Sequence, residues 1–168
     1  MYYNIIAATD IKNGIGLNGA IPWKCKSDLK RFSKLTKGTG YNAIIMGRKT
    51  WDSLPNNKPL PGRTNIVLTK NNDIQNSDNV FVFNTVHEIK AFCIAHDFHT
   101  GWIIGGEQIY RLFIDDPDVE HLYLTEISGT YECDTFFPSF NGFKIYQTDE
   151  WEDEETDITC KLRVYERR

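Results

Sequence analysis

One carboxylate in the N-terminal third of the chain stands where it could do acid–base chemistry. Asp28 follows Trp23 closely and begins the segment DLKRFSKLTKG, whose apolar residues recur at helical spacing. Phe32 comes four residues later, so a helix brings the carboxylate and the ring to one face. An apolar pocket should raise the pKa of Asp28, which could then bind adjacent N–H and NH₂ groups and assist protonation of a ring nitrogen. The alternative is a capping role at the helix start, shared with Ser27.

The stretch GIGLNG, at residues 14–19, matches the glycine spacing of dinucleotide-binding turns. Its surroundings do not fit such a turn. Residues 10–13 separate it from the preceding apolar run, and Pro22 would break a helix that began at the third glycine. The stretch instead predicts a mobile loop ending in AIPW, in which Ile21 and Trp23 exclude water from whatever the loop covers.

The elements that must position these residues alternate between strand and helix. The predicted strands are NIIAAT, NAIIMG, TNIVLT, VFVFN, GWIIGG, HLYLTEI and ITCKLRVYE, and the predicted helices are DLKRFSKLTKG, RKTWDSL, TVHEIKAFCIAH and EQIYRLFI. Thr85 and Glu88 form a capping box for the third helix. The last strand alternates apolar and polar residues, which is typical of an antiparallel strand with one wet face. This order predicts an α/β fold with a mostly parallel sheet covered on both sides.

Composition limits the possible functions. The chain has 168 residues, of which 40% are hydrophobic and 25% charged, and a net charge of −4 argues against nucleic acid binding. The sequence has no apolar run of membrane-spanning length and no signal peptide, and its separated cysteines indicate reduced thiols, so we expect a cytoplasmic protein. His96 and His99 have no further ligands beside them, so no metal site is expected. The acidic run DEWEDEETD predicts a solvated loop.

Six blocks together resemble the dihydrofolate reductase family. GIGLNGAIPW followed by SDLKRF resembles its mobile active-site loop and catalytic helix, and IIMGRKTWDSLP resembles its strand and cofactor-binding helix. PLPGRTNIVLT, IIGGEQIY, LYLTEI and CDTFFP match further blocks in the family's order. The resemblance implies a single domain over residues 1–168, with an eight-stranded mixed sheet, flanking helices and an antiparallel C-terminal strand.

The implied activity is NADPH-dependent reduction of 7,8-dihydrofolate to tetrahydrofolate, which supplies one-carbon metabolism and thymidylate and purine synthesis. Hydride would pass from nicotinamide C4 to pterin C6, and a proton to N5. Asp28 would hold the N3 and 2-amino edge of the pterin and promote protonation of N5 through water, and Thr125 would support that network. Without the resemblance, Thr125 is typical of a plain strand threonine.

The resemblance also assigns the rest of the substrate site. Arg63 in LPGR would pair in bidentate fashion with the α-carboxylate of the glutamate tail, and Lys58 would add positive charge nearby. Lys58 lies in an NNK stretch that is longer than the family pattern. The other residues implied for the substrate are Ile6, Ala8, Leu29, Phe32, Leu54, Leu60, Ile104 and Tyr110.

Two junctions between a strand and a helix are expected to hold the phosphates of the cofactor. In IIMGRKT, cationic side chains join free N–H groups at a helix start, and in IIGGEQIY a glycine pair, cis in the family, lets the backbone approach closely. The charge available to a 2′-phosphate favours NADPH over NADH; it comes from Arg48, Lys49 and Lys70, and Thr69 adds a hydroxyl beside Lys70. The full set implied for the cofactor is Ala8, Ile15, Gly16, Asn18, Gly19, Ala20, Gly47, Arg48, Lys49, Thr50, Leu68, Thr69, Lys70, Ile104, Gly105, Gly106, Glu107, Gln108, Ile109 and Tyr110.

The chain departs from the family pattern in WKCKSD, where the family commonly has Leu-Pro. Cys25 in this stretch is expected to be exposed or half-exposed, either as a reactive thiol or as inert packing. The expected partners are dihydrofolate and antifolates such as methotrexate or trimethoprim, and the chain is expected to be a monomer. Two alternatives are an NADPH reductase of riboflavin synthesis with the same fold, and a non-catalytic scaffold that binds a pterin or a nucleotide.

Overall fold

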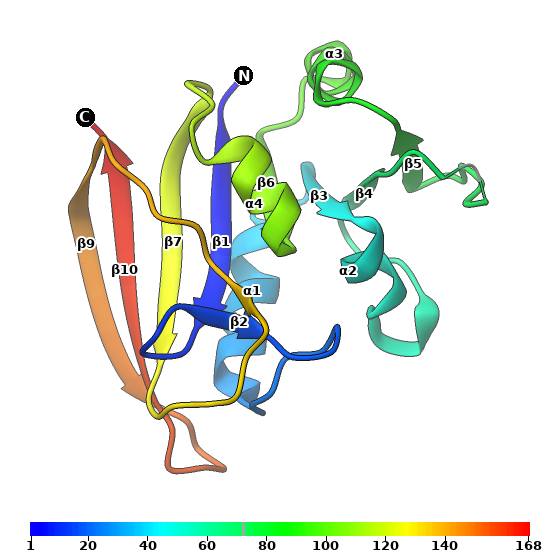
Figure 1. Cartoon of the computed structure of the whole chain (residues 1–168). Helices are drawn as coiled ribbons and strands as arrows, with labels where there is room; N and C mark the ends of the chain where they lie inside the picture. The colour runs from blue at the N-terminus through cyan, green and yellow to red at the C-terminus, as the bar shows by residue number, and fades with distance from the viewer. Residues whose placement is uncertain (72) are drawn as a thin grey trace.

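Eight strands form the central sheet of the computed structural model, which describes residues 1–71 and 73–168. They are β1 (Tyr3–Thr9), β3 (Asn42–Gly47), β4 (Thr64–Leu68), β5 (Val80–Phe83), β6 (Thr100–Gly105), β7 (Val119–Ile127), β9 (Phe143–Glu152) and β10 (Thr159–Arg167). Their order across the sheet is β5-β4-β3-β6-β1-β7-β10-β9 (Figure 1). The strands from β5 to β7 pair in parallel, whereas β10 is antiparallel to both β7 and β9. The predicted mixed sheet with an antiparallel C-terminal strand is confirmed.

Burial explains which strands the sequence pattern predicts. Every residue of β3 is buried, as the unbroken run NAIIMG requires of a central parallel strand. In β10, Cys160, Leu162 and Val164 are buried, and the residues between them are more exposed. The pattern does not predict β9, because it is an edge strand whose side chains are mostly exposed.

Within residues 1–71 and 73–168, four α-helices cover the two faces of the sheet. They are α1 (Lys26–Lys37), α2 (Arg48–Asp52), α3 (Val86–His96) and α4 (Glu107–Phe113), and a 3₁₀ turn, η1, follows α2 at Pro55–Asn57. Gly38 ends α1 at a φ of +51°. Thr85 caps α3 by accepting a hydrogen bond from the backbone N–H of Glu88 at 3.1 Å, as the capping box predicts.

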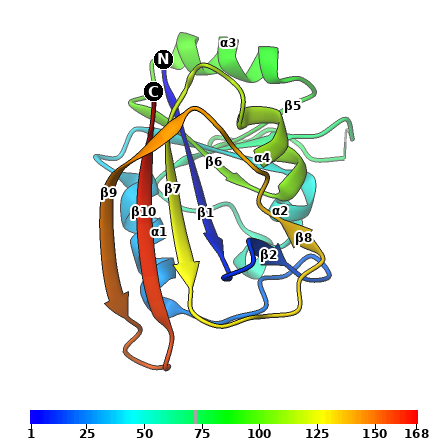
Figure 2. The same cartoon turned by 60° about the vertical axis from the view of Figure 1, so that its left-hand side comes forward.

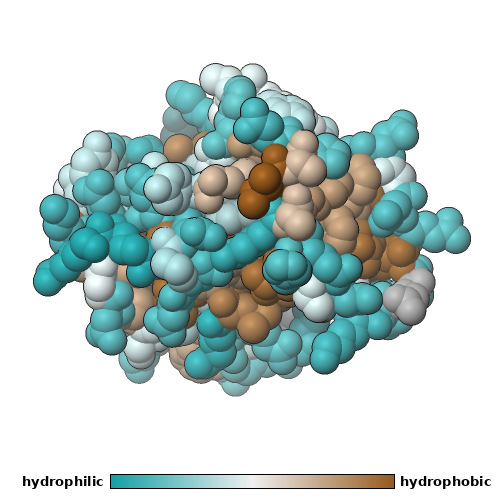
Figure 3. Space-filling view, turned by 90° about the horizontal axis from the view of Figure 1, so that it is seen from above, coloured by the Kyte–Doolittle hydropathy of each residue, from teal (hydrophilic) through white to brown (hydrophobic). Residues whose placement is uncertain are grey.

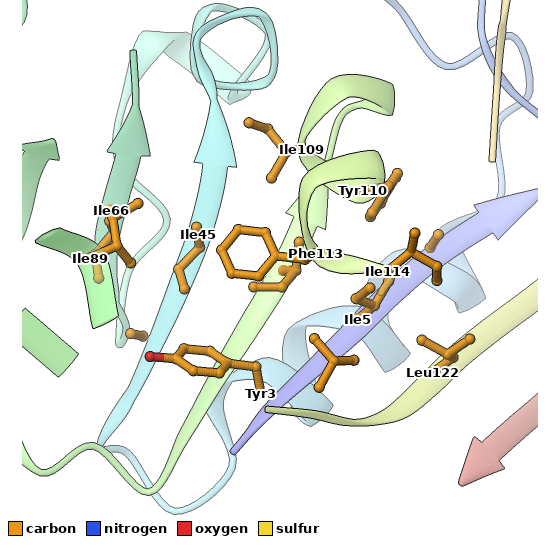
Figure 4. Packing of buried hydrophobic residues seen from close by; sticks show 14 of the residues in the cluster. Tyr3, Ile5, Ile45, Ile66, Ile89, Ile109, Tyr110, Phe113, Ile114 and Leu122 are labelled. Carbon is orange, nitrogen blue, oxygen red and sulfur yellow. The ribbon is translucent and has the colours of Figure 1, made fainter. Parts of the chain in front are cut away.

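The described part of the core has a large cluster on each face of the sheet and a smaller third cluster around Trp23, Cys25, Ile127 and Cys160. Beneath α3 and α4, side chains such as Ile89, Ile109 and Phe113 form one cluster with Tyr3 and Ile5 of β1 (Figure 4). The other large cluster lies between the sheet and α1; its strand residues are Ile6, Ile44, Met46, Val67 and Trp102. Hydrophilic residues cover most of the side of the molecule seen in Figure 3, and apolar residues form a few patches between them. Within the described ranges, no helix has the length and apolarity needed to span a bilayer.

Part of the GIGLNG stretch is strand and not loop. Strand β2 (Gly14–Gly16) pairs antiparallel with β8 (Thr135–Phe136) in a separate small sheet beside the end of β1 (Figure 2). The turn that follows is closed by the pair Leu17 and Ala20, and Asn18 and Gly19 at its tip have positive φ. The expected loop is therefore shorter than predicted, because its first half is held by backbone pairing with a distant segment.

Candidate active site

Asp28 lies in the first turn of α1, where its carboxylate meets Thr125 of β7. Thr125 is buried, and its hydroxyl lowers the pKa of this carboxylate. Burial raises the pKa of Asp28 from its ordinary 3.8 to about 6, although Thr125 and the Arg31 cation act in the opposite direction. Asp28 can therefore take up and release a proton near neutral pH, which suits a group that assists proton transfer.

Ionisation of Asp28 is expected to reduce the free energy of unfolding. Its pKa in the folded chain, about 6, lies above the ordinary 3.8. The destabilisation that ionisation causes is therefore absent when the pH is below both pKa values and complete when the pH is above both. Asp28→Asn should therefore raise the free energy of unfolding by about 1–3 kcal/mol at mildly alkaline pH, and the gain should vanish as the pH falls below about 3. Urea unfolding at the two pH values measures this difference.

The control for this measurement is Asp115→Asn, which removes an exposed carboxylate elsewhere in the chain. It should change the free energy of unfolding by no more than about 0.5 kcal/mol at either pH. A gain from Asp28→Asn that persisted unchanged in acid would contradict the raised pKa.

The start of α1 is capped by a residue from the far end of the chain. Asp153, in the turn between β9 and β10, is buried and accepts a hydrogen bond from the backbone N–H of Ser27 at 3.0 Å. The Ser27 hydroxyl accepts a second bond from Trp151 Nε1 at 3.1 Å. Hydrogen bonds from Ser27 hold the pKa of Asp153 well below its usual range. Because Asp153 satisfies this N–H, the capping role considered for Asp28 is already filled.

Two expectations for this region are wrong. Cys25 is not exposed: it packs beside Trp23 under the start of α1, and its sulfur lies 3.4 Å from that of Cys160. The acidic run DEWEDEETD is not a solvated loop throughout, because its first four residues belong to β9 and Asp153 is buried at the helix start. Both errors arise because the β9–β10 hairpin folds back onto α1.

Arg63 is a buried cation at the other end of α1. Only 6% of this residue is exposed to solvent. Its Nη1 donates a hydrogen bond to Thr36 Oγ1 at 3.0 Å, and its Nε donates one to the Pro61 carbonyl at 2.9 Å. Burial lowers the pKa of Arg63. In the described part of the chain, Arg63 forms no ion pair with an Asp or Glu. A buried guanidinium without a counter-charge is costly, and its fork is suited to an external carboxylate.

One face of α1 connects these two groups. Asp28, Phe32 and Thr36 recur every four residues and therefore share that face. With a rise of 1.5 Å per residue, Asp28 and Thr36 are about 12 Å apart along the helix axis. Arg63 is attached to Thr36, so the helix holds a titratable carboxyl group and a buried cation at opposite ends, with an aromatic ring between them. This arrangement fits an elongated ligand that is polar at one end and anionic at the other.

The other residues predicted for the substrate lie in three settings. Ile6, Phe32, Leu54 and Leu60 belong to the cluster beneath α1, whereas Ala8 packs in a separate cluster with Trp23. Trp23 is buried against Tyr131, with ring centroids 5.3 Å apart. Of the residues predicted for the substrate, Leu29 and Lys58 are exposed, as is Ile21 at the end of the loop.

The two glycine junctions predicted for the cofactor lie side by side. A Cβ added at Gly47 would stand 2.8 Å from Ile109 Cγ1 of α4 and 3.9 Å from the Gly105 carbonyl. A Cβ added at Gly106 would stand 3.7 Å from Thr50 Oγ1 of α2. The fold therefore brings IIMGRKT and IIGGEQIY together, and Gly47 allows Ile109 of α4 to pack closely against the end of β3.

Tyr110 of α4 connects this junction to the neighbouring strands β1 and β6. Its hydroxyl lies 2.8 Å from the Ile6 carbonyl and 2.9 Å from the Ile104 carbonyl, and burial raises its pKa. Gly105 has a φ of +119°, and a Cβ added there would stand 3.1 Å from the same hydroxyl. The Gly105–Gly106 peptide is cis, as the resemblance implies. Tyr110 thus ties α4 to β1 and β6.

The cations predicted for a 2′-phosphate differ in their surroundings. Arg48, at the start of α2, pairs with Asp52 and Asp73, whereas Lys49 and Lys70 are exposed. The Thr69 hydroxyl accepts a hydrogen bond from the backbone N–H of Asn71, at 3.1 Å. With five residues, α2 is short, so side-chain charge supplies most of the attraction for an anion here.

The remaining predicted cofactor residues lie around the small sheet and α4. Asn18 donates its backbone N–H to Asp134 at 3.0 Å, which fixes the tip of the GIGLNG turn. Glu107 accepts a hydrogen bond from the backbone N–H of Phe136 in β8, so it has a structural role at the start of α4. Ile15 and Leu68 are half-buried, Gly16 is buried, and Gly19, Ala20 and Gln108 are exposed.

Sequence reasoning misses three residues that shape the site: Thr36, Asp73 and Asp153. The helical spacing from Asp28 through Phe32 would have found Thr36. Asp73 and Asp153 lie in irregular segments, where no periodic pattern indicates what an acid contacts.

Comparisons with known proteins agree with this geometry. The family model described as "Dihydrofolate reductase" matches residues 2–167. A dihydrofolate reductase from Heliothis virescens is 39% identical over 98% of this chain and 96% of its own length. A bifunctional dihydrofolate reductase-thymidylate synthase from Zea mays is 37% identical over 86% of this chain, which corresponds to 30% of that protein. The structure of dihydrofolate reductase from Enterococcus faecalis, complexed with NADP(H) and RAB-propyl, superposes with a TM-score of 0.86 at 33% identity, covering 99% of this chain and 96% of that one.

Proposed function

This chain belongs to the dihydrofolate reductase family, and on that premise we propose that it reduces 7,8-dihydrofolate to tetrahydrofolate with NADPH as the hydride donor. The observation that carries the proposal is the face of α1, with a carboxyl group of raised pKa at one end and a buried, unpaired guanidinium at the other. Dihydrofolate has the matching groups: a pterin edge of adjacent N–H and NH₂ donors, an aryl ring, and a glutamate carboxylate.

Asp28 acts at the pterin end of the site. Its ionised form accepts hydrogen bonds from pterin N3 and the 2-amino group, and Thr125 orients the carboxylate through its hydroxyl. This edge of the pterin is remote from N5, so Asp28 promotes protonation of N5 through water and not by direct contact. Trp23 and Ile21, at the end of the GIGLNG loop, exclude bulk water from the reacting atoms.

Arg63 acts at the tail end. It binds the α-carboxylate of the glutamate with the part of its fork that Thr36 and Pro61 leave unused. Lys58 adds positive charge at this end of the site. Phe32, between the two ends, contacts the aryl ring.

The residues around the paired junctions fit NADPH. Gly47 and Gly106 directly precede α2 and α4, whose first backbone N–H groups can bind the pyrophosphate. Arg48, Lys49 and Lys70 supply the charge that a 2′-phosphate needs. When NADPH is bound here, its nicotinamide supplies the hydride that the reaction requires.

A steady-state assay tests the proposal. NADPH oxidation by the purified protein should depend on added dihydrofolate, and saturating methotrexate should raise the melting temperature, because a ligand that binds only the folded state stabilises it. Oxidation no faster with dihydrofolate than without it would sink the proposal. Turnover of a pyrimidine intermediate of riboflavin synthesis in its place would favour the same-fold alternative, and binding of NADPH without turnover of either would favour a scaffold.

We further propose that residues 1–168 make up one dihydrofolate reductase domain that is monomeric and cytoplasmic. One sheet running through the whole chain supports the single domain. The four free cysteines suit a reducing compartment. Sedimentation equilibrium measures the oligomeric state directly.

A further inference from the structure

Arg48 is held by two carboxylates that belong to different parts of the chain. Its Nε donates to Asp52 Oδ1 at 2.9 Å, within α2. Its two terminal nitrogens both pair with Asp73, in the connection between β4 and β5, and Nη2 lies 3.0 Å from Asp73 Oδ2. The side chain of Arg48 is 31% exposed and that of Asp73 is 53% exposed, so the pair can be reached from solvent.

The contact with Asp73 uses the part of Arg48 that would bind a phosphate. Two parallel N–H groups on the terminal nitrogens match two oxygens of a carboxylate or of a phosphate equally well. The hydrogen bonds from Arg48 lower the pKa of Asp73, so this carboxylate stays ionised at neutral pH. A phosphate that approaches the same fork meets a negative charge already bound there.

We propose that Asp73 is a specificity residue that competes with the 2′-phosphate of NADPH for the guanidinium of Arg48. The proposal rests on the function proposed above, in which Arg48 lies at the 2′-phosphate site. NADPH binds by replacing the Asp73 carboxylate on the terminal nitrogens, while the bond from Nε to Asp52 keeps the guanidinium in place. NADH has no 2′-phosphate and leaves the pair intact, so Asp73 lowers the preference of the protein for the phosphorylated cofactor.

The sign and size of the effect follow from this competition. Removing the charge of Asp73 frees the fork of Arg48 and removes repulsion from the phosphate. An exposed ion pair and a screened contact between like charges each contribute little, and together they predict about a three- to thirtyfold change in affinity. The change should appear for ligands with a 2′-phosphate only, and it should shrink at high salt.

The test compares 2′,5′-ADP with 5′-AMP, which differ only in the 2′-phosphate, by isothermal titration calorimetry. Asp73→Asn should tighten binding of 2′,5′-ADP about three- to thirtyfold and change binding of 5′-AMP less than about twofold. The matched control is Asp78→Asn, which removes an exposed acid from the same connection between β4 and β5. That variant should change both affinities by less than about twofold.

The possible results separate this proposal from the one on which it rests. If the wild-type protein binds 2′,5′-ADP no better than 5′-AMP, Arg48 is not at a 2′-phosphate site, and the cofactor assignment fails first. If the wild-type protein prefers 2′,5′-ADP but Asp73→Asn leaves that preference unchanged, the competition proposed for Asp73 is wrong. If Asp73→Asn weakens 2′,5′-ADP binding, Asp73 holds Arg48 in its binding position, and competition is again excluded. An equal gain from Asp78→Asn would assign the effect to general charge.

Discussion

Asp28→Asn is expected to lower kcat/KM for dihydrofolate by about 100- to 10,000-fold at neutral pH. Asparagine keeps the shape of the side chain and an acceptor for the Thr125 hydroxyl, but it cannot carry a proton or a negative charge. The pterin edge then loses its charged partner, and N5 loses the group that promotes its protonation. Affinity for NADPH alone should change little, because Asp28 belongs to the pterin end of the site.

The pH dependence distinguishes this role from simple damage to the fold. In the wild-type protein, the rate should fall as the pH rises through the pKa of Asp28, near 6 in the free protein, because the site where ionised Asp28 binds the pterin then seldom holds the further proton that must reach N5. In Asp28→Asn this inflection should be absent, and the rate should rise in acid as solvent protonates the substrate. The deficit should therefore be largest at neutral pH and smaller in acid.

Steady-state rates measured across this pH range check the expectation. A variant with the wild-type profile and a uniformly lower rate would contradict the role of Asp28 in protonation. Because Asp28→Asn should also be the more stable protein at neutral pH, loss of folded protein cannot account for the expected deficit.

Replacing Arg63 should chiefly affect substrate binding. Arg63→Gln removes the charge that meets the glutamate carboxylate, and hydrogen bonds to a charged group contribute about 1.5–3 kcal/mol. The KM for dihydrofolate should therefore rise about 10- to 100-fold, with a much smaller change in kcat, since the tail binds equally in the ground state and in the transition state. Arg63→Lys should rescue little, because an ammonium group cannot form the bidentate pair.

A dihydropterin that lacks the benzoylglutamate tail is the matched control substrate. With this substrate, the wild-type protein and Arg63→Gln should have similar kcat/KM values, because the substrate has no carboxylate for Arg63 to bind. An equal loss with both substrates would indicate that Arg63 supports the fold near Thr36 and not the substrate tail. The melting temperature of the variant reports on that possibility separately, since removing a buried unpaired cation should not destabilise the chain.

Much of the fold could be predicted from local patterns. Strands such as β3 lie between helices on both sides, so burial forces an unbroken apolar run that can be read directly. Strands β2, β8 and β9 could not be predicted in this way. The first two pair glycines and short segments far apart in the chain, and β9 is an exposed edge strand, so no side-chain pattern indicates any of them.

The chemistry of the site follows from residue types. A carboxylate four residues before an aromatic ring, and two strand-to-helix junctions with glycines and cations, indicate a candidate acid–base group and a candidate phosphate site, and the family resemblance predicts a pterin for the first. These signals are local, because a helix or a turn imposes a fixed geometry on a few successive residues. The sequence by itself therefore determines which groups can bind and react.

Only the tertiary structure decides the state of those groups. Asp153 caps α1 from 126 residues away, so Asp28 is not needed as the cap. Thr36 fixes Arg63 at the far end of the same helix, and Asp73 occupies the fork of Arg48. The physical reason is that burial, pKa and ion pairing depend on every group that surrounds a side chain. In a sheet whose strand order differs from the order of the sequence, those groups come from segments that no local pattern connects.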